Sequence, residues 1–361
     1  MKTRASGISK KQGDGAHHPQ VSPPSSTGDH ISRRHFIAAA AGAGTLGLLA
    51  ASPRYAGAQA RAKMSLKFGY INPVDSVHHQ AAQRIAEDVK SRTNGDLQID
   101  LFPGGQLGSE KDMIDGNIVG SIHLTMGSGL YLAYAPKMGI VDAPYVFRDV
   151  GHLVRACRGV IGQEINEQLV AKGMRSVGVF LLGARKITTG KKPIAKLEDL
   201  KGLKLRVPNV ATYIAFFKAV GTNPVAIPIQ EAYLALQTGM ADGQENPWAQ
   251  ISSFKFYEVQ KYLAKTDHVI NVNFVTVSEK WWAAAPAEFR QALGEAIEKG
   301  AEWQVQTILE NEGRLEQEWR TRGNEITTPD PAPFRKVADD VLAQFEEKWG
   351  KGLLERARAV S

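Results

Sequence analysis

The sequence predicts an α/β fold divided into two lobes. Two stretches, which begin near residues 66 and 183, each alternate strand-like and helix-like patterns, and this order is typical of a parallel sheet covered by helices. The chain has 361 residues, of which roughly 300 follow an N-terminal region unlike a folded domain. That length is enough for two lobes with separate hydrophobic cores.

The first stretch has the pattern of a βαβ unit. Apolar residues alternate over 66–70 and again over 97–101, as in strands with one better-buried face. Between these strands, apolar residues recur every four positions over 77–89, which predicts a helix. A further helix is expected over 110–118 and a further strand over 122–126. A strand, a helix and a strand in this order predict parallel pairing.

The second stretch repeats this organisation after a loop expected over 188–193. Strands are predicted over 203–207 and 225–228, where apolar residues alternate or cluster before a proline. Helices are predicted over 211–220 and 231–237, and each is followed by a glycine that can end it. The stretch therefore predicts a second parallel unit.

The last part of the chain is expected to be helical. From Pro286 onward, apolar residues recur at helical spacing, beginning with Phe289, Leu293 and Ile297. Charged residues are dense over 310–322, which indicates a helix that lies largely in solvent.

Residues 1–60 have the order of a removable export signal. Their first half is rich in Ser, Pro, Gly and His, and we expect it to be disordered. The segment 32–37, Ser-Arg-Arg-His-Phe-Ile, resembles the twin-arginine (Tat) export motif. An apolar run over 36–51, too short for a membrane span, precedes small residues that favour cleavage near Ala58 or Ala60. Export to the periplasm is therefore expected, with an ordinary Sec signal as the alternative to the Tat route.

Charge and cysteine content restrict the partners of the chain. The formal net charge is +7, but residues 1–58 hold seven Lys/Arg and two Asp/Glu, so this segment carries +5 of it. The high isoelectric point belongs mainly to the export signal, and no nucleic-acid partner is expected. Cys157 is the only cysteine, so an internal disulfide is excluded, and such a residue is usually small and buried.

The sequence lacks the motifs of common catalytic and metal sites. It contains no P-loop, no Gly-x-Ser-x-Gly and no His-Glu-x-x-His. His78 and His79 are adjacent on a predicted helix, so their side chains diverge by about 100° and cannot share a metal ion. We therefore expect no metal, no cofactor and no enzymatic activity. An exported periplasmic enzyme is the rival interpretation.

A long, ordered set of motifs identifies a family. These motifs occupy the segments 102–109, 143–148, 183–185, 199–209, 231–247 and 256–262. They closely resemble the solute-receptor subunit of TRAP (tripartite ATP-independent periplasmic) transporters of the dicarboxylate-receptor type. The resemblance covers essentially the whole chain after the export signal.

The resemblance implies a two-lobe periplasmic binding protein of the type II-like Venus flytrap kind, with long C-terminal and lobe-spanning helices. We expect the first lobe to comprise residues 61–182 and 272–310, and the second lobe residues 183–271 and 311–361. Such a receptor closes on a small organic acid and delivers it to integral-membrane TRAP permease subunits. A monomer is expected. A role in sensing the acid for a signalling partner is the alternative to transport.

Arg206 is the main candidate for binding the ligand. It lies at the carboxyl end of a predicted parallel strand, where ligands bind in α/β sheets. Its guanidinium can donate two parallel hydrogen bonds to one carboxylate. In similar receptors, the matching arginine pairs with the carboxylate of the ligand. An exposed arginine on an edge strand is the alternative.

Four further residues of the motif match ligand-facing positions or lie beside them. Arg185 either contacts the ligand or forms a salt bridge that orders its loop. Asn209 either bonds the ligand or caps the next helix, and Asn246 matches a position that contacts the ligand. Glu245 either contacts the ligand or holds an arginine in place.

The remaining candidates carry weaker signals. Asn72 and Ser128 follow predicted strands of the first lobe, whereas His78 lies on a helix near the expected cleft. Trp248 either forms a wall of the pocket or packs in a core. Ile229 stands where many relatives have an aromatic residue that stacks on the ligand. This difference slightly favours a ligand that needs no ring stacking there.

Sialic acid is disfavoured as the ligand. Sialic-acid receptors of the family carry an acidic residue near the positions of Gly127 and Ser128, and this chain has none there. The sialate-like segment 206–212, Arg-Val-Pro-Asn-Val-Ala-Thr, does not outweigh that difference.

Overall fold

The computed structural model describes residues 64–361, and the strands in that range form one ten-stranded sheet. The predicted export signal, with cleavage near Ala58 or Ala60, lies outside these residues. The strands are β1 (Met64–Gly69), β2 (Leu97–Phe102), β3 (Leu124–Gly127), β4 (Met174–Thr189), β5 (Lys204–Val207), β6 (Asn223–Ala226), β7 (Gly243–Pro247), β8 (Tyr262–Ala264), β9 (Ile270–Ser278) and β10 (Glu325–Thr327).

The sheet contains two groups of strands that meet at β4. The strand order is β2-β1-β3-β9-β4-β7-β5-β6, and β8 pairs with both β4 and β10. We call β1, β2, β3 and β9 the first strand group, and β5, β6, β7, β8 and β10 the second. β1 pairs in parallel with β2 and β3, and β5 pairs in parallel with β6 and β7. The two predicted parallel units are therefore confirmed, whereas β7 and β9 were not predicted from the sequence.

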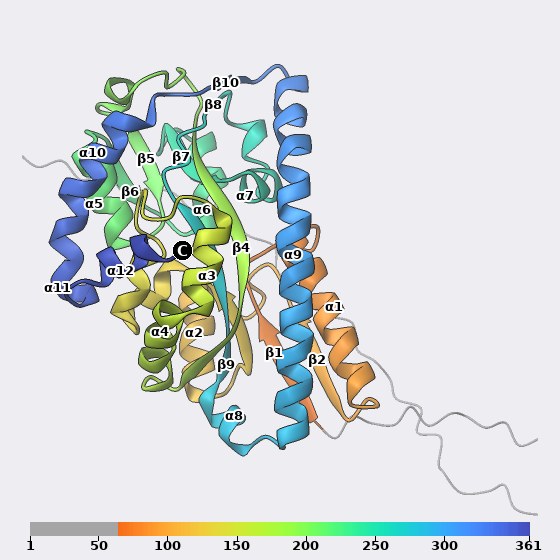
Figure 1. The fold of residues 1–361 in the computed structure, drawn as a ribbon. Helices are drawn as coiled ribbons and strands as arrows, with labels where there is room; N and C mark the ends of the chain where they lie inside the picture. The colour runs from red at the N-terminus through yellow and green to blue at the C-terminus, as the bar shows by residue number, and fades with distance from the viewer. Residues whose placement is uncertain (1–63) are drawn as a thin grey trace, which may run out of the picture. The chain divides into compact units, whose positions relative to one another are not determined.

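Helices cover both strand groups. The α-helices are α1 (Val77–Arg92), α2 (Glu110–Val119), α3 (Val150–Arg158), α4 (Val160–Val170), α5 (Ala211–Ala219), α6 (Ile229–Gln237), α7 (Trp248–Ser253), α8 (Glu279–Ala284), α9 (Ala287–Thr321), α10 (Pro331–Leu342), α11 (Glu346–Trp349) and α12 (Leu353–Ala359). Short 3-10 helices are η1 (Gly129–Ala133), η2 (Pro136–Ile140), η3 (Leu197–Leu200), η4 (Phe256–Glu258) and η5 (Ala343–Phe345). Figure 1 shows α1 beside α9 at the first strand group, and α5 beside α10 at the second.

Strand β4 joins the two groups and corrects one prediction. Its residues 174–184 pair with β9, and residues 185–189 pair with β7. The loop expected over 188–193 is therefore wrong at Thr188 and Thr189, which belong to the strand. The register with β9 shifts between Leu181 and Gly183, and Gly183 has a φ of 111°, a conformation that favours glycine. Because residues 180–189 of β4 are buried apart from Ala184, this part of its sequence lacks a clean alternation.

Helix α9 spans both strand groups as one continuous element of 35 residues, about 52 Å long. It packs against α1 and β4, and farther along against α7 and β10 (Figure 1). The helical C-terminal part is confirmed. The expectation that 310–322 lies largely in solvent holds for one face only, because Leu315 and Trp319 are buried. The predicted lobe boundary near residue 310 falls inside this helix.

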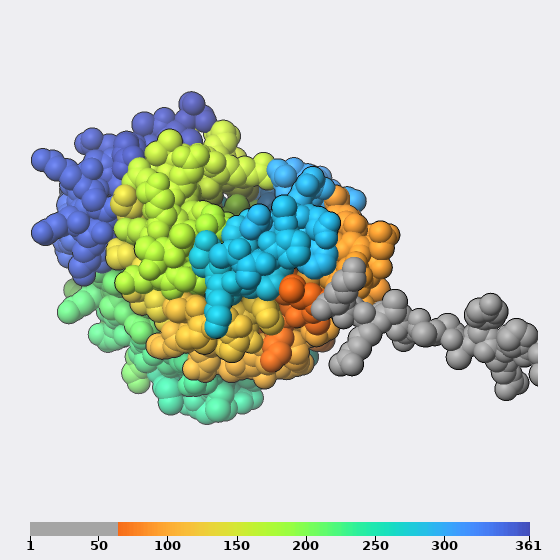
Figure 2. Space-filling model, turned by 90° about the horizontal axis from the view of Figure 1, so that it is seen from below, coloured from red at the N-terminus to blue at the C-terminus, as the bar shows by residue number. Residues whose placement is uncertain are grey.

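The interior contains a separate hydrophobic cluster beneath each end of α9. At one end, α1, α9 and the first strand group enclose Phe68, Ile85 and Ile297. At the other end, Trp248 and Trp319 pack together. A larger cluster extends from α3 and α4 to α5 and α10. In Figure 2, the light-blue residues around α8 lie beside the orange residues of the first βαβ unit. No helix within residues 64–361 has the length and apolar character needed to cross a membrane.

Candidate functional site

A cavity of about 970 Å³ lies among the strand ends and loops of both strand groups. Its polar and charged lining residues are Ser109, Glu110, Lys111, Ser128, Tyr134, Arg185, Arg206, Asn209, Tyr213, Gln230, Asn246, Gln250, Asn273 and Lys348. Its apolar lining residues include Ile71, Leu130, Leu132, Pro136, Leu182, Ile214, Ile227, Ile229, Phe345 and Trp349. The cavity therefore combines cationic groups with an extensive apolar wall.

Arg206 lies in the wall of this cavity with its side chain only 2% exposed. Strand β5 lies between β6 and β7, so the alternative of an exposed arginine on an edge strand is wrong. Its Nε donates a hydrogen bond of 2.8 Å to the Ile227 carbonyl, and it forms no ion pair with a carboxylate of residues 64–361. Burial lowers the pKa of Arg206 to about 10, so the guanidinium remains charged at neutral pH.

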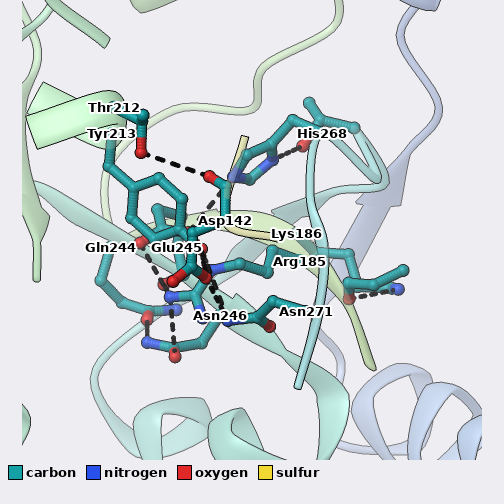
Figure 3. A network of polar contacts seen from close by, with 12 residues as sticks. Asp142, Arg185, Lys186, Thr212, Tyr213, Gln244, Glu245, Asn246, His268 and Asn271 are labelled. Carbon is teal, nitrogen blue, oxygen red and sulfur yellow. Dashed lines mark hydrogen bonds and ion pairs between the residues drawn. The ribbon is translucent and has the colours of Figure 1, made fainter. Parts of the chain in front are cut away.

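Arg185 also lines the cavity, but its charge is balanced inside the protein. Its Nε and Nη2 donate to the two carboxylate oxygens of Glu245, and Nη2 also donates to the Glu245 carbonyl and to Asn246 Oδ1 (Figure 3). Burial acts to lower the pKa of Arg185, but the Glu245 carboxylate more than offsets this effect and raises it. Glu245, which is fully buried, takes the bracing position that the sequence left open.

His268 contacts the same oxygen of Glu245 that accepts a hydrogen bond from Arg185 Nε. Its Nε2 lies 3.2 Å from Glu245 Oε2, and its Nδ1 lies 2.8 Å from Thr266 Oγ1. Burial lowers the pKa of His268, so the ring is neutral at neutral pH. The ionised Glu245 carboxylate can only accept hydrogen bonds. In the neutral ring, Nε2–H therefore donates to Glu245 Oε2 and Nδ1 accepts from the Thr266 hydroxyl. The sequence did not predict this role, because nothing along the chain shows which buried group a histidine contacts.

A second buried carboxylate lies near Arg185. The Tyr213 hydroxyl donates to Asp142 Oδ1 at 3.0 Å, and Asn271 Nδ2 donates to the same oxygen at 3.2 Å. Burial raises the pKa of Asp142 to about 6. The Arg185 guanidinium lies 5.1 Å from the centre of the Tyr213 ring. The residues around Arg185 thus form a connected polar network (Figure 3), in which Glu245 already pairs with the charge of Arg185.

Four of the other predicted site residues line the cavity, namely Asn209, Asn246, Ser128 and Ile229. Asn209 lies exposed after β5 and does not cap α5, since Val210 occupies the N-cap position without a side-chain bond. Asn246 donates from Nδ2 to Gln244 Oε1 at 2.6 Å.

Three other candidates do not line the cavity. Trp248 packs against Trp319 with ring centres 6.0 Å apart, so the expectation of a pocket wall is wrong and the core alternative is correct. His78 is buried between Phe180 and Gln304, because its position on α1 faces β4 and α9. Asn72 is buried behind Ile71, and neither atom of its side-chain amide has a hydrogen-bond partner.

Glu110 is a cavity residue that the sequence did not predict. It is the first residue of α2, whose start is fixed by a capping box between Ser109 and Asp112. Glu110 Oε1 accepts a hydrogen bond of 3.0 Å from the Ser128 backbone N–H. The chain has no acidic residue at Gly127 or Ser128, but α2 brings a carboxylate to this point in space. The sequence argument against sialic acid considered only residues close to Gly127 and Ser128 along the chain. It did not consider a carboxylate that α2 brings to this point from another part of the chain.

The described residues contain no group of three or more His, Cys, Asp or Glu side chains placed to hold a metal ion.

The family model of the bacterial extracellular solute-binding proteins, family 7 (DctP), matches residues 68–348. The chain belongs to the DctP family. The sialic acid-binding periplasmic protein SiaP of Vibrio cholerae is 32% identical to it over 307 residues, which cover 84% of this chain and 95% of SiaP. The name of this relative describes a periplasmic solute-binding protein.

Two solved structures of DctP-type proteins extend the comparison to the fold. A TRAP periplasmic solute-binding protein from Polaromonas sp. JS666, bound to D-erythronate, has a TM-score of 0.79 and 30% identity, covering 82% of this chain and 99% of its own. The sugar acid-binding protein DctPAm from Advenella mimigardefordensis, in complex with galactonate, has a TM-score of 0.80 and 27% identity, covering 83% and 100%. The predicted two-lobe α/β periplasmic binding fold is confirmed by this similarity.

Proposed function

We propose that this DctP-family protein is an exported receptor that holds the carboxylate of a small organic acid on Arg206 and delivers the acid to TRAP permease subunits. One observation supports the role of Arg206 above all. It is a buried cation in the cavity wall without an ion-pair partner among the described residues. A buried charge without a partner is costly, and an anionic ligand removes that cost.

The contrast with the other cations of the cavity supports the same assignment. Arg185 is paired with Glu245, Lys111 is paired with Asp115, and Lys348 is exposed to solvent, so Arg206 is the cation of the cavity that is both buried and without an ion pair. Arg206 therefore offers the guanidinium that is free to bind a new carboxylate. Its Nε is bonded to the Ile227 carbonyl, which fixes the plane of the guanidinium and leaves its Nη groups for the ligand. Neighbours with bound D-erythronate and galactonate support an acid as the ligand.

Binding of D-erythronate or galactonate to purified Arg206→Ala, measured by calorimetry, tests this proposal. We expect affinity to fall by at least ~100-fold, because the ligand loses a charge-assisted pair in a buried site. Arg206→Lys is also expected to bind poorly, since a lysine cannot reproduce the planar fork. Lys204→Ala is the matched control, because Lys204 is exposed on the same strand. Unchanged affinity in Arg206→Ala contradicts the assignment.

Delivery to a permease and Tat export need separate tests. We infer both from the TRAP receptors that resemble the chain and from the segment 32–37. Transport of labelled acid in cells that carry the permease, with and without the receptor, tests delivery. Replacement of both arginines of the export motif by lysine is expected to abolish export through the Tat route, and unchanged export indicates the Sec route instead.

A further inference from the structure

Glu110 brings a carboxylate into the same cavity as Arg206. Its Oε1 accepts from the Ser128 N–H at 3.0 Å, and this is the hydrogen bond that the described residues supply to its side chain. A Cβ atom on Gly127 would lie 2.3 Å from Glu110 Oε1, so the glycine is what allows the carboxylate to approach the backbone. The second oxygen, Oε2, has no donor from the described residues and remains available to a ligand.

The titratable groups near Glu110 come from three other elements. Arg206 faces it from β5, Asp142 from the segment after η2, and the Tyr131 hydroxyl from η1. Burial, with a smaller contribution from Asp142, raises the pKa of Glu110 to about 7, while the Ser128 N–H and Arg206 oppose this shift. Both protonation states are therefore populated near neutral pH.

A carboxylate in this position discriminates among acids that bind to Arg206. A ligand hydroxyl can donate to Glu110, and hydrogen bonds to charged groups are the stronger ones in proteins. A second ligand carboxylate at the same place meets a like charge, which disfavours binding. An alkyl group at the same place displaces water from Glu110 Oε2 and gives this oxygen no hydrogen-bond donor in return, which is costly. When Glu110 is ionised, a hydroxylated acid with one carboxylate satisfies both Arg206 and Glu110.

We propose that Glu110 determines the specificity of the receptor and selects hydroxylated monocarboxylates over dicarboxylates and over unsubstituted acids. This inference rests on the proposed role of Arg206 as the carboxylate site. Glu110 supplies a second polar contact, which binds a hydroxyl group in the part of the ligand distant from its carboxylate.

Two sets of acids with matched chain length provide the test. The four-carbon set is D-erythronate, succinate and butyrate, and the six-carbon set is galactonate, adipate and hexanoate. Within each set, the acids differ in their hydroxyl groups or in a second carboxylate and not in the number of carbon atoms. We expect the wild-type protein to bind at least one hydroxylated acid ~10- to 100-fold more tightly than both other acids of its set in calorimetry at pH 8.

Glu110→Gln keeps the size of the side chain and removes its charge. We expect this variant to lose ~10-fold in affinity for the hydroxylated acid, to gain affinity for the dicarboxylate, and to bind the unsubstituted acid within ~2-fold of wild type. Glu298→Gln is the matched control, because Glu298 is exposed on α9 and lies outside the cavity lining. A gain in dicarboxylate affinity also demonstrates that the variant is folded.

The pH dependence gives a readout that a purely structural role of Glu110 does not produce. The preference for the hydroxylated acid over the dicarboxylate is expected to be larger at pH 8, where Glu110 is mostly ionised, than at pH 6. In Glu110→Gln, this difference between the two pH values should disappear.

Several outcomes overturn the proposal. One is a dicarboxylate or unsubstituted acid that binds wild type as tightly as the hydroxylated acid of its set. A second is an equal loss of affinity for all acids in Glu110→Gln, and a third is the absence of binding by both hydroxylated acids. Arg206→Met separates the two hypotheses. If it binds every acid like wild type, the carboxylate site is wrong. If it loses all acids while Glu110→Gln keeps the wild-type selectivity, only the role of Glu110 is wrong.

Discussion

Arg185 and Arg206 line the same cavity, yet the protein treats their charges in opposite ways. Arg185 has a bidentate partner in Glu245, which is in turn held by His268. Arg206 has one carbonyl acceptor and no carboxylate partner in the described residues. The difference indicates that a buried arginine in a binding site can be either part of the scaffold or a ligand contact, and that its partner distinguishes these roles.

The largest expected effect comes from the scaffold side of this comparison. Arg185→Met leaves the Glu245 carboxylate buried without its cation, and we expect the free energy of unfolding to fall by about 3–5 kcal/mol. Urea unfolding of the ligand-free protein measures this quantity. Arg175→Met is the control, because the Arg175–Glu279 pair is partly exposed and should cost no more than about 1 kcal/mol. Equal losses in the two variants contradict the assignment of Arg185 to the scaffold.

The region near Arg206 is held by close packing, which a methyl group can test. A Cβ on Gly129 would lie 2.2 Å from Val210 Cγ2, and a β-branched valine has little freedom to move aside. Gly129→Ala is expected to lower the free energy of unfolding by about 1–3 kcal/mol. Adding Val210→Ala should recover part of this loss in the double variant. Additive losses in a double-mutant cycle exclude a direct contact between the two positions.

The pH dependence of the unfolding free energy tests the contribution of His268, which contacts Glu245 on the scaffold side of the comparison. Its folded-state pKa is lowered, so the stability it contributes is complete above its unfolded pKa of about 6.5 and is lost as the pH falls. Below pH 6.5, we expect wild type to lose up to about 1.4 kcal/mol for each pH unit relative to His268→Gln. Urea unfolding of both proteins at pH 7.5 and 5.0 gives this difference, in which the opposite contributions of Asp142 and Glu110 cancel. Parallel pH profiles show that His268 does not titrate on unfolding.

The smallest expected effect belongs to the ligand-facing arginine. Arg206→Met removes a buried cation that has no anionic partner, so any loss in the unfolding free energy of the ligand-free protein should stay below about 1 kcal/mol, and a gain agrees with the cost of that buried charge. The same variant is expected to lose ligand affinity, whereas Arg185→Met loses stability first. A loss of several kcal/mol in Arg206→Met would show that the two arginines do not differ in the proposed way.

The sequence predicted the elements whose pattern is local. The strand before Pro208 and the helices at 77–89 and 110–118 carry their own periodicity, and the structure has β5, α1 and α2 at these positions. The pattern Thr188-Thr189-Gly190 predicts a loop for the last two residues of β4, whereas pairing with β7 and β8 holds these two threonines in a strand. Tertiary pairing of this kind leaves no periodic signal.

The candidate site likewise contains residues that the sequence predicted and a residue that it did not. Arg206, Arg185 and Asn246 occupy positions that the family motif made visible. Glu110 enters the cavity because α2 and the strand before Ser128 meet in space, 18 residues apart in the chain. Trp248 follows the motif directly, but its side chain turns toward α9, and no local pattern reports that direction.

The middle of α9 is fastened to β4 beside the register shift at Gly183. Gln304 accepts from the Leu181 N–H and donates to the Leu181 carbonyl, each at 2.8 Å, and it lies midway between Ala287 and Thr321. Each end of the helix is about 26 Å from this anchor. A rotation of about 10° about the anchor would displace both ends by about 4–5 Å in opposite directions. Gln304 thus lies at the point from which a small change in the angle between α9 and β4 would move both ends of the helix furthest.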